Sequence, residues 1–223
     1  MFGGHYGPSY ALKTARPGLS LGLLFLLTQL PDLLWSALHL LGIERSEPVR
    51  DPHTGRRRLR FVTASYSHSL AATLAWAALA YAGARWLLPG PRPERQRDAL
   101  LVAGTVGSHW LLDAVVMPPE LPLWGNSAKV GLDLQRHRPA ALLAEAALLL
   151  GPLVWYARRT SSDGTLVGGY GMAMLGALQL LFTAIGSFTP PPETMRTTAA
   201  SGLGVFLTFA ALGEWLSRKR IVP

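Results

Sequence analysis

The chain has 223 residues, of which 49% are hydrophobic and only 15% carry a charge, whereas soluble domains usually carry about 25% charged residues. The charges cluster between long neutral stretches, which is typical of a multi-pass membrane protein and argues against a soluble domain. The sequence contains no cysteine, so disulfides and thiolate metal sites are excluded. The net charge of +8 fits basic residues that flank apolar spans, so we expect membrane lipids rather than nucleic acid as partners.

The N-terminal segment GGHYGPSYALKTARPG is too polar to cross a membrane by itself. It forms either an interfacial segment or a short helix that turns at Arg16 to Gly18 and packs back along the first span. In the second arrangement His5 and Asp32 lie at similar depths, because a similar length of helix separates each of them from the turn.

Six apolar stretches approach the roughly 20 residues that a membrane-spanning helix requires. Prolines lie at most of their edges, where a helix tolerates them, and Pro31 inside the first stretch should bend it. The sequence therefore predicts an all-α fold, a single transmembrane helical bundle over 1–223 with the short N-terminal helix folded back toward the first span. The expected spans are about 19–42, 67–88, 98–117, 140–157, 164–188 and 198–216.

A hairpin outside the bilayer is expected at about 46–63, because DPHTG is a turn signal between two short extended runs. We interpret His53 in this turn as a solvated loop histidine with no role. Six spans put both termini on one side of the membrane, and the nearly even distribution of lysine and arginine weakly favours the cytoplasmic side. The expected location is the inner (plasma) membrane.

Ionisable side chains within spans are functional candidates, because each costs roughly 2.5–3.5 kcal/mol to insert. Asp32 lies in the first span, His68 opens the second, His109 and Asp113 share a face of the third, and Glu145 is isolated in the fourth.

Because successive spans alternate in direction, all these groups are expected at one end of the bundle, and the folded-back N-terminus would bring His5 to the same end. Imidazole nitrogens and carboxylate oxygens suit zinc, manganese or iron. We therefore expect a divalent metal, with zinc favoured. The expected ligands are His5, Asp32, His68, His109 and Asp113.

Taken one at a time, these residues have simpler interpretations. A single His-x3-Asp pair such as His109 and Asp113 is more often a buried hydrogen-bonded pair than a metal site. A single intramembrane glutamate such as Glu145 is more often protonated or hydrogen-bonded than a ligand. The convergence of several such groups at one end favours the metal.

The motifs YSHSLAATL, GSHWLLDAVV, LPD and GHYG together resemble the YdjM-like family of bacterial inner-membrane metal-dependent hydrolases, also labelled LexA-binding. The resemblance extends over nearly the whole chain and includes PPELPLWGNSAKVGLDL. It implies a helical membrane protein with a His/Asp metal centre, and a hydrolase activity by similarity to zinc-dependent phospholipase C and nuclease-type enzymes. The matching positions are His5, Asp32, His68, His109, Asp113 and Glu145. The chain departs from the family pattern at Met117, where related sequences tend to have histidine.

The leading hypothesis is a membrane-embedded hydrolase in which a metal-activated water attacks an interfacial substrate such as a lipid phosphoester. Glu145 or Asp32 would act as general base, and Arg136 or Arg138 would hold an anionic head group. One alternative is a transporter or ion-binding protein, which would need a polar path across the bundle. Another is a scaffold whose buried polar groups only fix the packing of the helices.

Overall fold

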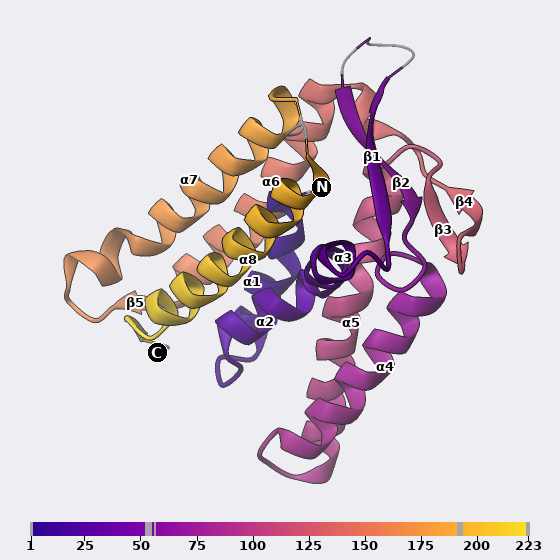
Figure 1. Ribbon diagram of the computed structural model, residues 1–223. Coiled ribbons are helices and arrows are strands. Elements are labelled where there is room, and N and C mark those ends of the chain that lie inside the picture. Colours follow the sequence, from indigo (N-terminus) through magenta and orange to yellow (C-terminus); the bar gives the residue numbers. More distant parts are fainter. Residues whose placement is uncertain (1, 52–54, 56, 191–193, 222–223) are drawn as a thin grey trace.

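The computed structural model describes residues 2–51, 55, 57–190 and 194–221 (Figure 1). Helices dominate these residues, and three small two-stranded sheets accompany them. The α-helices are α1 (Tyr6–Ala15), α2 (Leu21–Thr28), α3 (Leu30–Leu40), α4 (Leu70–Leu87), α5 (Arg92–Val116), α6 (Arg138–Arg159), α7 (Leu166–Phe188) and α8 (Met195–Ser217). Short 3-10 turns η1 and η2 cover Gly3–His5 and Leu134–Arg136. The strands are β1 (Arg45–Arg50), β2 (Arg57–Thr63), β3 (Leu121–Trp124), β4 (Ser127–Val130), β5 (Ser161–Ser162) and β6 (Arg220–Ile221).

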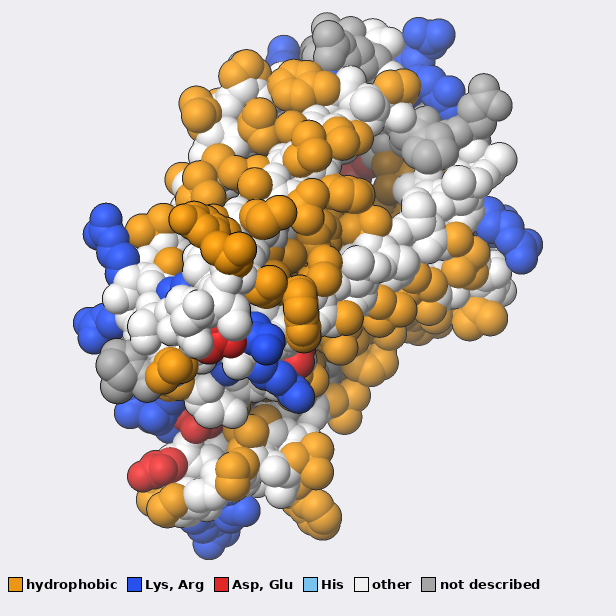
Figure 2. All heavy atoms as spheres, turned by 90° about the vertical axis from the view of Figure 1, so that its left-hand side faces the viewer, with side chains coloured by type: hydrophobic (Ala, Val, Ile, Leu, Met, Phe, Trp, Pro, Cys, Tyr) orange, Lys and Arg blue, Asp and Glu red, His pale blue; other side chains and the backbone are white. Residues whose placement is uncertain are grey.

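Four of these helices, α5 to α8, are long and apolar enough to cross a membrane, and the bent pair α2 and α3 makes a fifth candidate. Figure 2 shows a broad band of apolar side chains on the side of the molecule that α7 forms. Tyr170, Met174 and Leu181 of α7 are each more than half exposed. Apolar surface of this extent is expected against lipid rather than water. The predicted class, a helical multi-pass membrane protein, is confirmed at the level of four to five candidate spans.

The N-terminal segment adopts the second of the two arrangements expected from the sequence. Residues from η1 through α1 run down the bundle to Arg16, and α2 returns beside α1 after the turn that follows. Glycine permits close packing here, since a Cβ on Gly7 would lie 2.1 Å from the carbonyl oxygen of Leu148 in α6. Tyr6 and Tyr10 of α1 are fully buried in the largest apolar cluster. The N-terminal segment is therefore part of the core.

The first predicted span is broken at Gln29, where α2 and α3 meet at an angle of 60°. Pro31 stands at the start of α3, and it lacks the N–H that a continuous helix would need at that position. The expected bend is present, and it places Asp32 in the first turn of α3. A carboxylate is favourable there, because the start of a helix carries partial positive charge.

Two hairpins lie at the end of the bundle where α5 ends and α6 begins (Figure 1). The β1–β2 hairpin occupies the predicted segment, with Glu47 opposite Arg60 in its register. The second hairpin, β3–β4, follows α5 directly. Arg58 of β2 joins the two hairpins by donating two hydrogen bonds to Glu120, at 3.0 and 2.7 Å. His53, predicted to have no role, lies outside the described residues.

Candidate metal centre

Five predicted ligands meet beneath the hairpins, although they come from four separate segments. Their potential ligand atoms form two overlapping groups, each with all atoms within 4.8 Å of one another. The members of the two groups are His5, His109 and Asp113, and Asp32, His68 and His109. The side chain of Asp32 is 21% exposed, and the other four are buried. The sequence-based expectation that these groups converge at one end of the bundle is therefore borne out by their positions.

The hydrogen bonding of His109 fixes which of its nitrogens can bind a cation. Its Nδ1 lies 2.8 Å from the backbone carbonyl oxygen of Thr28, which can only accept a hydrogen bond. Nδ1 must therefore carry the proton, and Nε2 of the neutral ring presents a lone pair. That Nε2 has no hydrogen-bond partner, and it lies 3.3 Å from Oδ2 of Asp113. The close approach of this nitrogen and the Asp113 carboxylate in a buried site is favourable when a proton or a metal cation lies between them.

His68 is held in the same orientation by a buried chain of hydrogen bonds. Ser67 donates its hydroxyl proton to Oε2 of Glu44 over 2.5 Å, and its own oxygen lies 2.8 Å from Nδ1 of His68. The N–H groups of Tyr66 and Ser67 donate to Oε1 of Glu44, which fixes this carboxylate. Since the Ser67 proton is committed to Glu44, His68 donates from Nδ1. Its Nε2 lone pair then points to Asp32, 3.2 Å away.

This pattern is that of metal-binding histidines. Such histidines usually donate the ring N–H that does not face the metal to a backbone carbonyl or to a carboxylate-linked group, which orients the ring. Local structure helps at His68, because the next residue, Ser69, caps α4 by accepting a hydrogen bond from the N–H of Ala72. The capped start of α4 therefore fixes the position of the His68 imidazole.

His5 approaches from the other oxygen of Asp113. Its Nε2 lies 3.5 Å from Oδ1 of Asp113 and 3.3 Å from the carbonyl oxygen of His109. Its Nδ1 is buried without a hydrogen-bond partner. The rings of His5 and His109 stack with their centroids 4.0 Å apart. Two protonated rings would repel each other at this distance, so the packing disfavours a charge on both rings at once.

The spacing of the donor atoms suits a small cation. Nε2 of His68 lies 3.2 Å from Asp32 and 3.8 Å from Asp113, and Nε2 of His109 lies 3.9 Å and 3.3 Å from the same two carboxylates. The ligand atoms of a tetrahedral zinc ion lie about 3.4 Å apart, as follows from bonds of about 2.0–2.1 Å. The spacing within each of the two groups therefore approaches that of the ligands of a zinc-sized ion, and the nitrogen and oxygen donors also suit manganese or iron.

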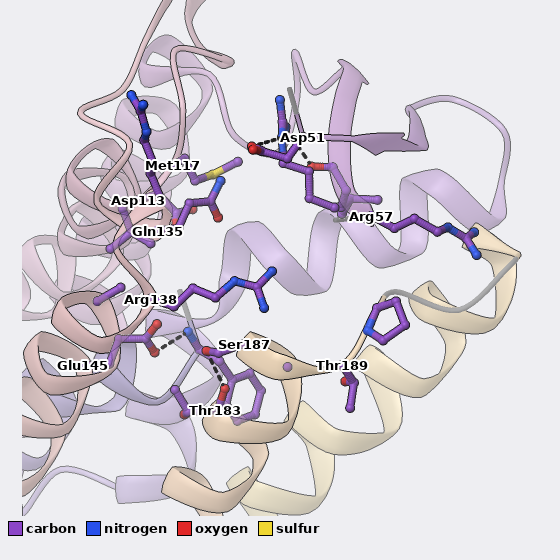
Figure 3. A pocket seen from close by; sticks show the side chains of 18 of the residues that line it. Asp51, Arg57, Asp113, Met117, Gln135, Arg138, Glu145, Thr183, Ser187 and Thr189 are labelled. Atoms are coloured by element: carbon purple, nitrogen blue, oxygen red, sulfur yellow. Dashed lines mark hydrogen bonds and ion pairs between the residues drawn. The ribbon is translucent and has the colours of Figure 1, made fainter. Parts of the chain in front are cut away.

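A cavity of about 480 Å³ reaches the centre from the hairpin end of the bundle. Asp32, His68 and Asp113 line it, so one side of the centre is accessible. Arg136 and Arg138, which we expected to bind an anion, line it as well. Figure 3 shows Arg138 reaching from the start of α6 into the middle of the cavity, between Glu145 and Asp51. Cationic and anionic side chains thus share one enclosed space.

The β1–β2 hairpin adds two further arginines to the cavity wall, Arg57 and Arg58. Arg58 is engaged by Glu120 and lies 3.4 Å from Asp51. Its hydrogen bonds to Glu120 raise the pKa of the Arg58 guanidinium above its ordinary value. Arg57 extends along the side of the cavity on which Thr189 lies (Figure 3). Neither arginine was predicted as a site residue, because both lie in a basic run typical of a solvated loop.

Glu145 lines the cavity but belongs to neither group of potential ligands. Its Oε2 accepts hydrogen bonds from the backbone N–H of Phe2 at 2.9 Å and of Gly3 at 3.1 Å. The Gly3 N–H also donates to the Thr183 hydroxyl at 3.0 Å. Glu145 therefore fixes the turn that carries His5, which corresponds to the simpler interpretation of an isolated glutamate as a hydrogen-bonded group.

Met117 ends α5 and lines the cavity one turn beyond Asp113 (Figure 3). Glu44 and Ser67 were not predicted as site residues. Glu44 stands in a charged segment after the first span, and nothing in its spacing links it to His68. Comparison with known proteins adds no relative, since no family model, curated protein or solved structure matches the chain.

Proposed function

We propose that this protein is a membrane-embedded metal-dependent hydrolase that cleaves a phosphoester of a lipid head group. One observation carries the proposal: Nε2 of His68 and Nε2 of His109 lie 3.2 and 3.3 Å from two carboxylates that line an accessible cavity with arginines in its wall. Imidazole nitrogens and carboxylate oxygens at this spacing are ligands that a divalent cation prefers, and the arginines suit an anionic substrate.

His68, His109, Asp32 and Asp113 would hold the ion, and His5 would either orient Asp113 through its Nε2–H or add a donor through Nδ1, its nitrogen without a hydrogen-bond partner. Zinc is favoured because the spacing and the mixed nitrogen and oxygen donors suit it. When bound, a divalent cation supplies Lewis acidity toward a phosphoryl oxygen and lowers the pKa of a water to about 7. Arg138, and Arg136 at the cavity wall, would hold the other oxygens of the phosphate.

Asp32 is the better candidate for the general base. Its side chain is the most exposed of the five and borders the cavity, so it can accept a proton from a water there. Glu145 is better described as a positioning residue, because its carboxylate already binds the N-terminal backbone. The same arrangement would also suit a protein that binds an ion without catalysis. A measurement of hydrolysis distinguishes these two functions.

We propose six membrane spans. Five are the bent pair α2 and α3 and the helices α5 to α8, and α4 would be the sixth. Leu74, Leu79 and Leu87 of α4 are exposed, which supports contact with lipid. Both termini would then lie on the cytoplasmic side of the inner membrane. Membership of the YdjM-like hydrolase family is part of the same proposal, supported by the sequence motifs and by the cluster of the residues that carry them.

Elemental analysis of detergent-purified protein tests the metal centre. The wild type should hold about one divalent ion per chain, and a His109→Ala, Asp113→Ala double variant should hold almost none, because it loses two donors. His39→Ala is the matched control, since His39 lies on α3 outside both ligand groups and should leave the metal content unchanged. Equal metal content in the double variant and the wild type would contradict the proposal.

Activity is then measured on phospholipids in mixed micelles, with the same protein before and after metal removal. We expect phosphate release or head-group release that is lost on chelation and restored by zinc, manganese or iron. Bound metal without any hydrolysis across the panel would favour an ion-binding protein over an enzyme.

A further inference from the structure

The cavity described above opens toward the apolar face of α7 as well as toward the hairpins. Its wall includes Thr183, Gly186 and Ser187 from the last turns of α7, and Thr198 from the first turns of α8. Figure 2, which views the α7 side, shows a recess in the upper part of this face with acidic atoms visible inside and apolar side chains around it. The polar interior is therefore reached between two helices that are candidates to cross the membrane.

The α7 residues beside this part of the cavity wall are apolar and exposed, although the lining residues themselves are small and mostly polar. Phe182, Ile185 and Phe188 of α7 are each between 40% and 53% exposed, and they lie on the turns that contribute to the cavity wall. Phe2 forms the inner side of the same wall and stacks on Phe182 and Phe206. Aromatic and aliphatic side chains around an opening suit a hydrocarbon chain and would gain nothing from a small water-soluble substrate.

The interior has the opposite character. Arg138 reaches into the middle of the cavity, and Arg57 lies on the side that leads to Thr189 (Figure 3). The carboxylates of Asp32 and Asp113, which belong to the candidate metal centre, also line the cavity. A phosphate fits between the guanidinium groups and a bound cation, because each side supplies positive charge. The volume of about 480 Å³ accommodates a phosphorylated head group but is small for two complete acyl chains.

We propose that the ligand is a phosphate-bearing membrane lipid that enters sideways from the bilayer, between α7 and α8, with its phosphate inside the cavity and its hydrocarbon chains left between the helices and in the membrane. This inference builds on the proposed function, since it names the access route and the substrate class of the same site. It assigns a specificity role to the last turns of α7, which touch no candidate metal ligand.

Gly186 provides a test of the route. It is exposed, it lines the cavity, and a Cβ added there meets no surrounding atom within 4 Å, so a larger side chain fits without disturbing the helix packing. Gly169, also on α7, is exposed with the same open space but does not line the cavity. Gly186→Phe should obstruct the opening, and Gly169→Phe is the matched control for an added aromatic ring on the same lipid-facing helix.

Binding is measured by native mass spectrometry of the full chain in detergent, with dioleoylphosphatidate, dioleoylglycerol and glycerol 3-phosphate as probes. The wild type should prefer the phosphatidate over both others. Gly186→Phe should weaken phosphatidate binding by about tenfold or more, which corresponds to excluding a few methylene groups from the opening, and Gly169→Phe should bind as the wild type does. Arg138→Gln should remove the preference of phosphatidate over dioleoylglycerol.

Three results would overturn the inference. The first is equal phosphatidate binding by Gly186→Phe and the wild type. The second is binding of glycerol 3-phosphate to the wild type as tightly as phosphatidate, which identifies a soluble phosphate ester as the ligand. The third is binding of dioleoylglycerol to the wild type as tightly as phosphatidate. Metal analysis of the same preparations keeps the two proposals apart. Metal-containing protein with an unaffected Gly186→Phe variant would contradict the lateral route alone. Selective phosphatidate binding by wild-type protein that holds no metal would contradict the metal centre alone.

Discussion

The two ends of this helical bundle differ in how their polar groups are paired, and those near the C-terminus are only partly buried. At the end near the C-terminus, Glu214 of α8 accepts hydrogen bonds from the Ser20 hydroxyl at 2.7 Å and the Gly22 N–H at 3.2 Å, and the Arg218 side chain donates to its other oxygen at 3.0 Å. Arg220 donates to the carbonyl oxygens of Ala157, Thr160 and Gly168. Donors there meet acceptors from within the chain.

At the hairpin end, some polar atoms have no hydrogen-bond partner among the described residues. Nε2 of His109 lacks such a partner and lies 3.3 Å from Asp113, while Nε2 of His68 lies 3.2 Å from Asp32. The second nitrogens of these two rings are satisfied, so the open positions are confined to the atoms that face the carboxylates. A proton or a cation between these atoms stabilises the site, and a divalent cation can serve several of them at once. The difference between the two ends teaches that polar burial alone does not identify a functional site, whereas open positions beside carboxylates do.

The largest difference in metal affinity is expected between one substitution at the hairpin end and one at the end near the C-terminus. His68→Ala should lower metal affinity by about 100-fold or more, since each of a few ligands contributes several kcal/mol to the total binding free energy. Glu214→Gln should leave metal affinity unchanged, because its partners are all within the chain. Competition with a fluorescent zinc chelator measures both. Equal affinity losses in the two variants would remove the distinction between the ends.

A smaller effect is expected from residues that orient the ligands without touching the ion. Glu44→Gln or Ser67→Ala disrupts the chain of hydrogen bonds that keeps the Nδ1 proton of His68 away from the site. Loss of such a partner typically lowers metal affinity about 10- to 100-fold. Glu47→Gln is the control, because Glu47 pairs with Arg60 on the exposed part of the hairpin. Chelator competition measures the metal affinity of all three variants. Equal affinities of Glu44→Gln and Glu47→Gln would refute this role of Glu44.

Glu145 tests whether the N-terminal turn is held in place by the chain itself. Glu145→Gln replaces a charged acceptor of two backbone N–H groups. The glutamine oxygen can still accept, but a hydrogen bond to a charged group contributes about 1.5–3 kcal/mol and one to a neutral group about 0.5–1.5 kcal/mol. Over the two bonds the free energy of unfolding should therefore fall by about 2 kcal/mol, with a weaker effect on metal affinity through His5. Unfolding in mixed micelles by added SDS measures it, beside Glu94→Gln at an exposed position of α5. Unchanged stability with abolished hydrolysis would instead restore Glu145 as a catalytic residue.

The helical class, the bend after Gln29, the β1–β2 hairpin and the grouping of Asp32, His68, His109 and Asp113 all followed from local patterns and from alternation of span direction. These features depend on neighbours in sequence or on simple topology, which periodicity and turn signals report.

Features that depend on folding at a distance could not be read in this way. Glu44 reaches Ser67 across the β1–β2 hairpin, and Glu145 binds a backbone more than one hundred residues away. The same holds for the wall of the cavity, to which α7, α8 and the N-terminal segment contribute. A charged residue in a loop looks the same in sequence whether it faces solvent or orients a ligand, and only the tertiary contact distinguishes the two.

Met117 offers the finest adjustment of the hairpin end. It stands one turn after Asp113 at the end of α5 and lines the cavity, at the position where the resembled family tends to have histidine. Met117→His would add an imidazole near the centre, and imidazole is a far better ligand than a thioether for zinc, manganese or iron. Because the surrounding donors are already in place, we expect metal affinity to rise by no more than about tenfold. Met117→Leu, which keeps the packing against Trp35 and Phe61 but offers no donor, should match the wild type. Identical metal affinities of the histidine and leucine variants would mean that the side chain at position 117 does not reach the ion. Met117 would then be part of the cavity wall and not a neighbour of the metal ligands.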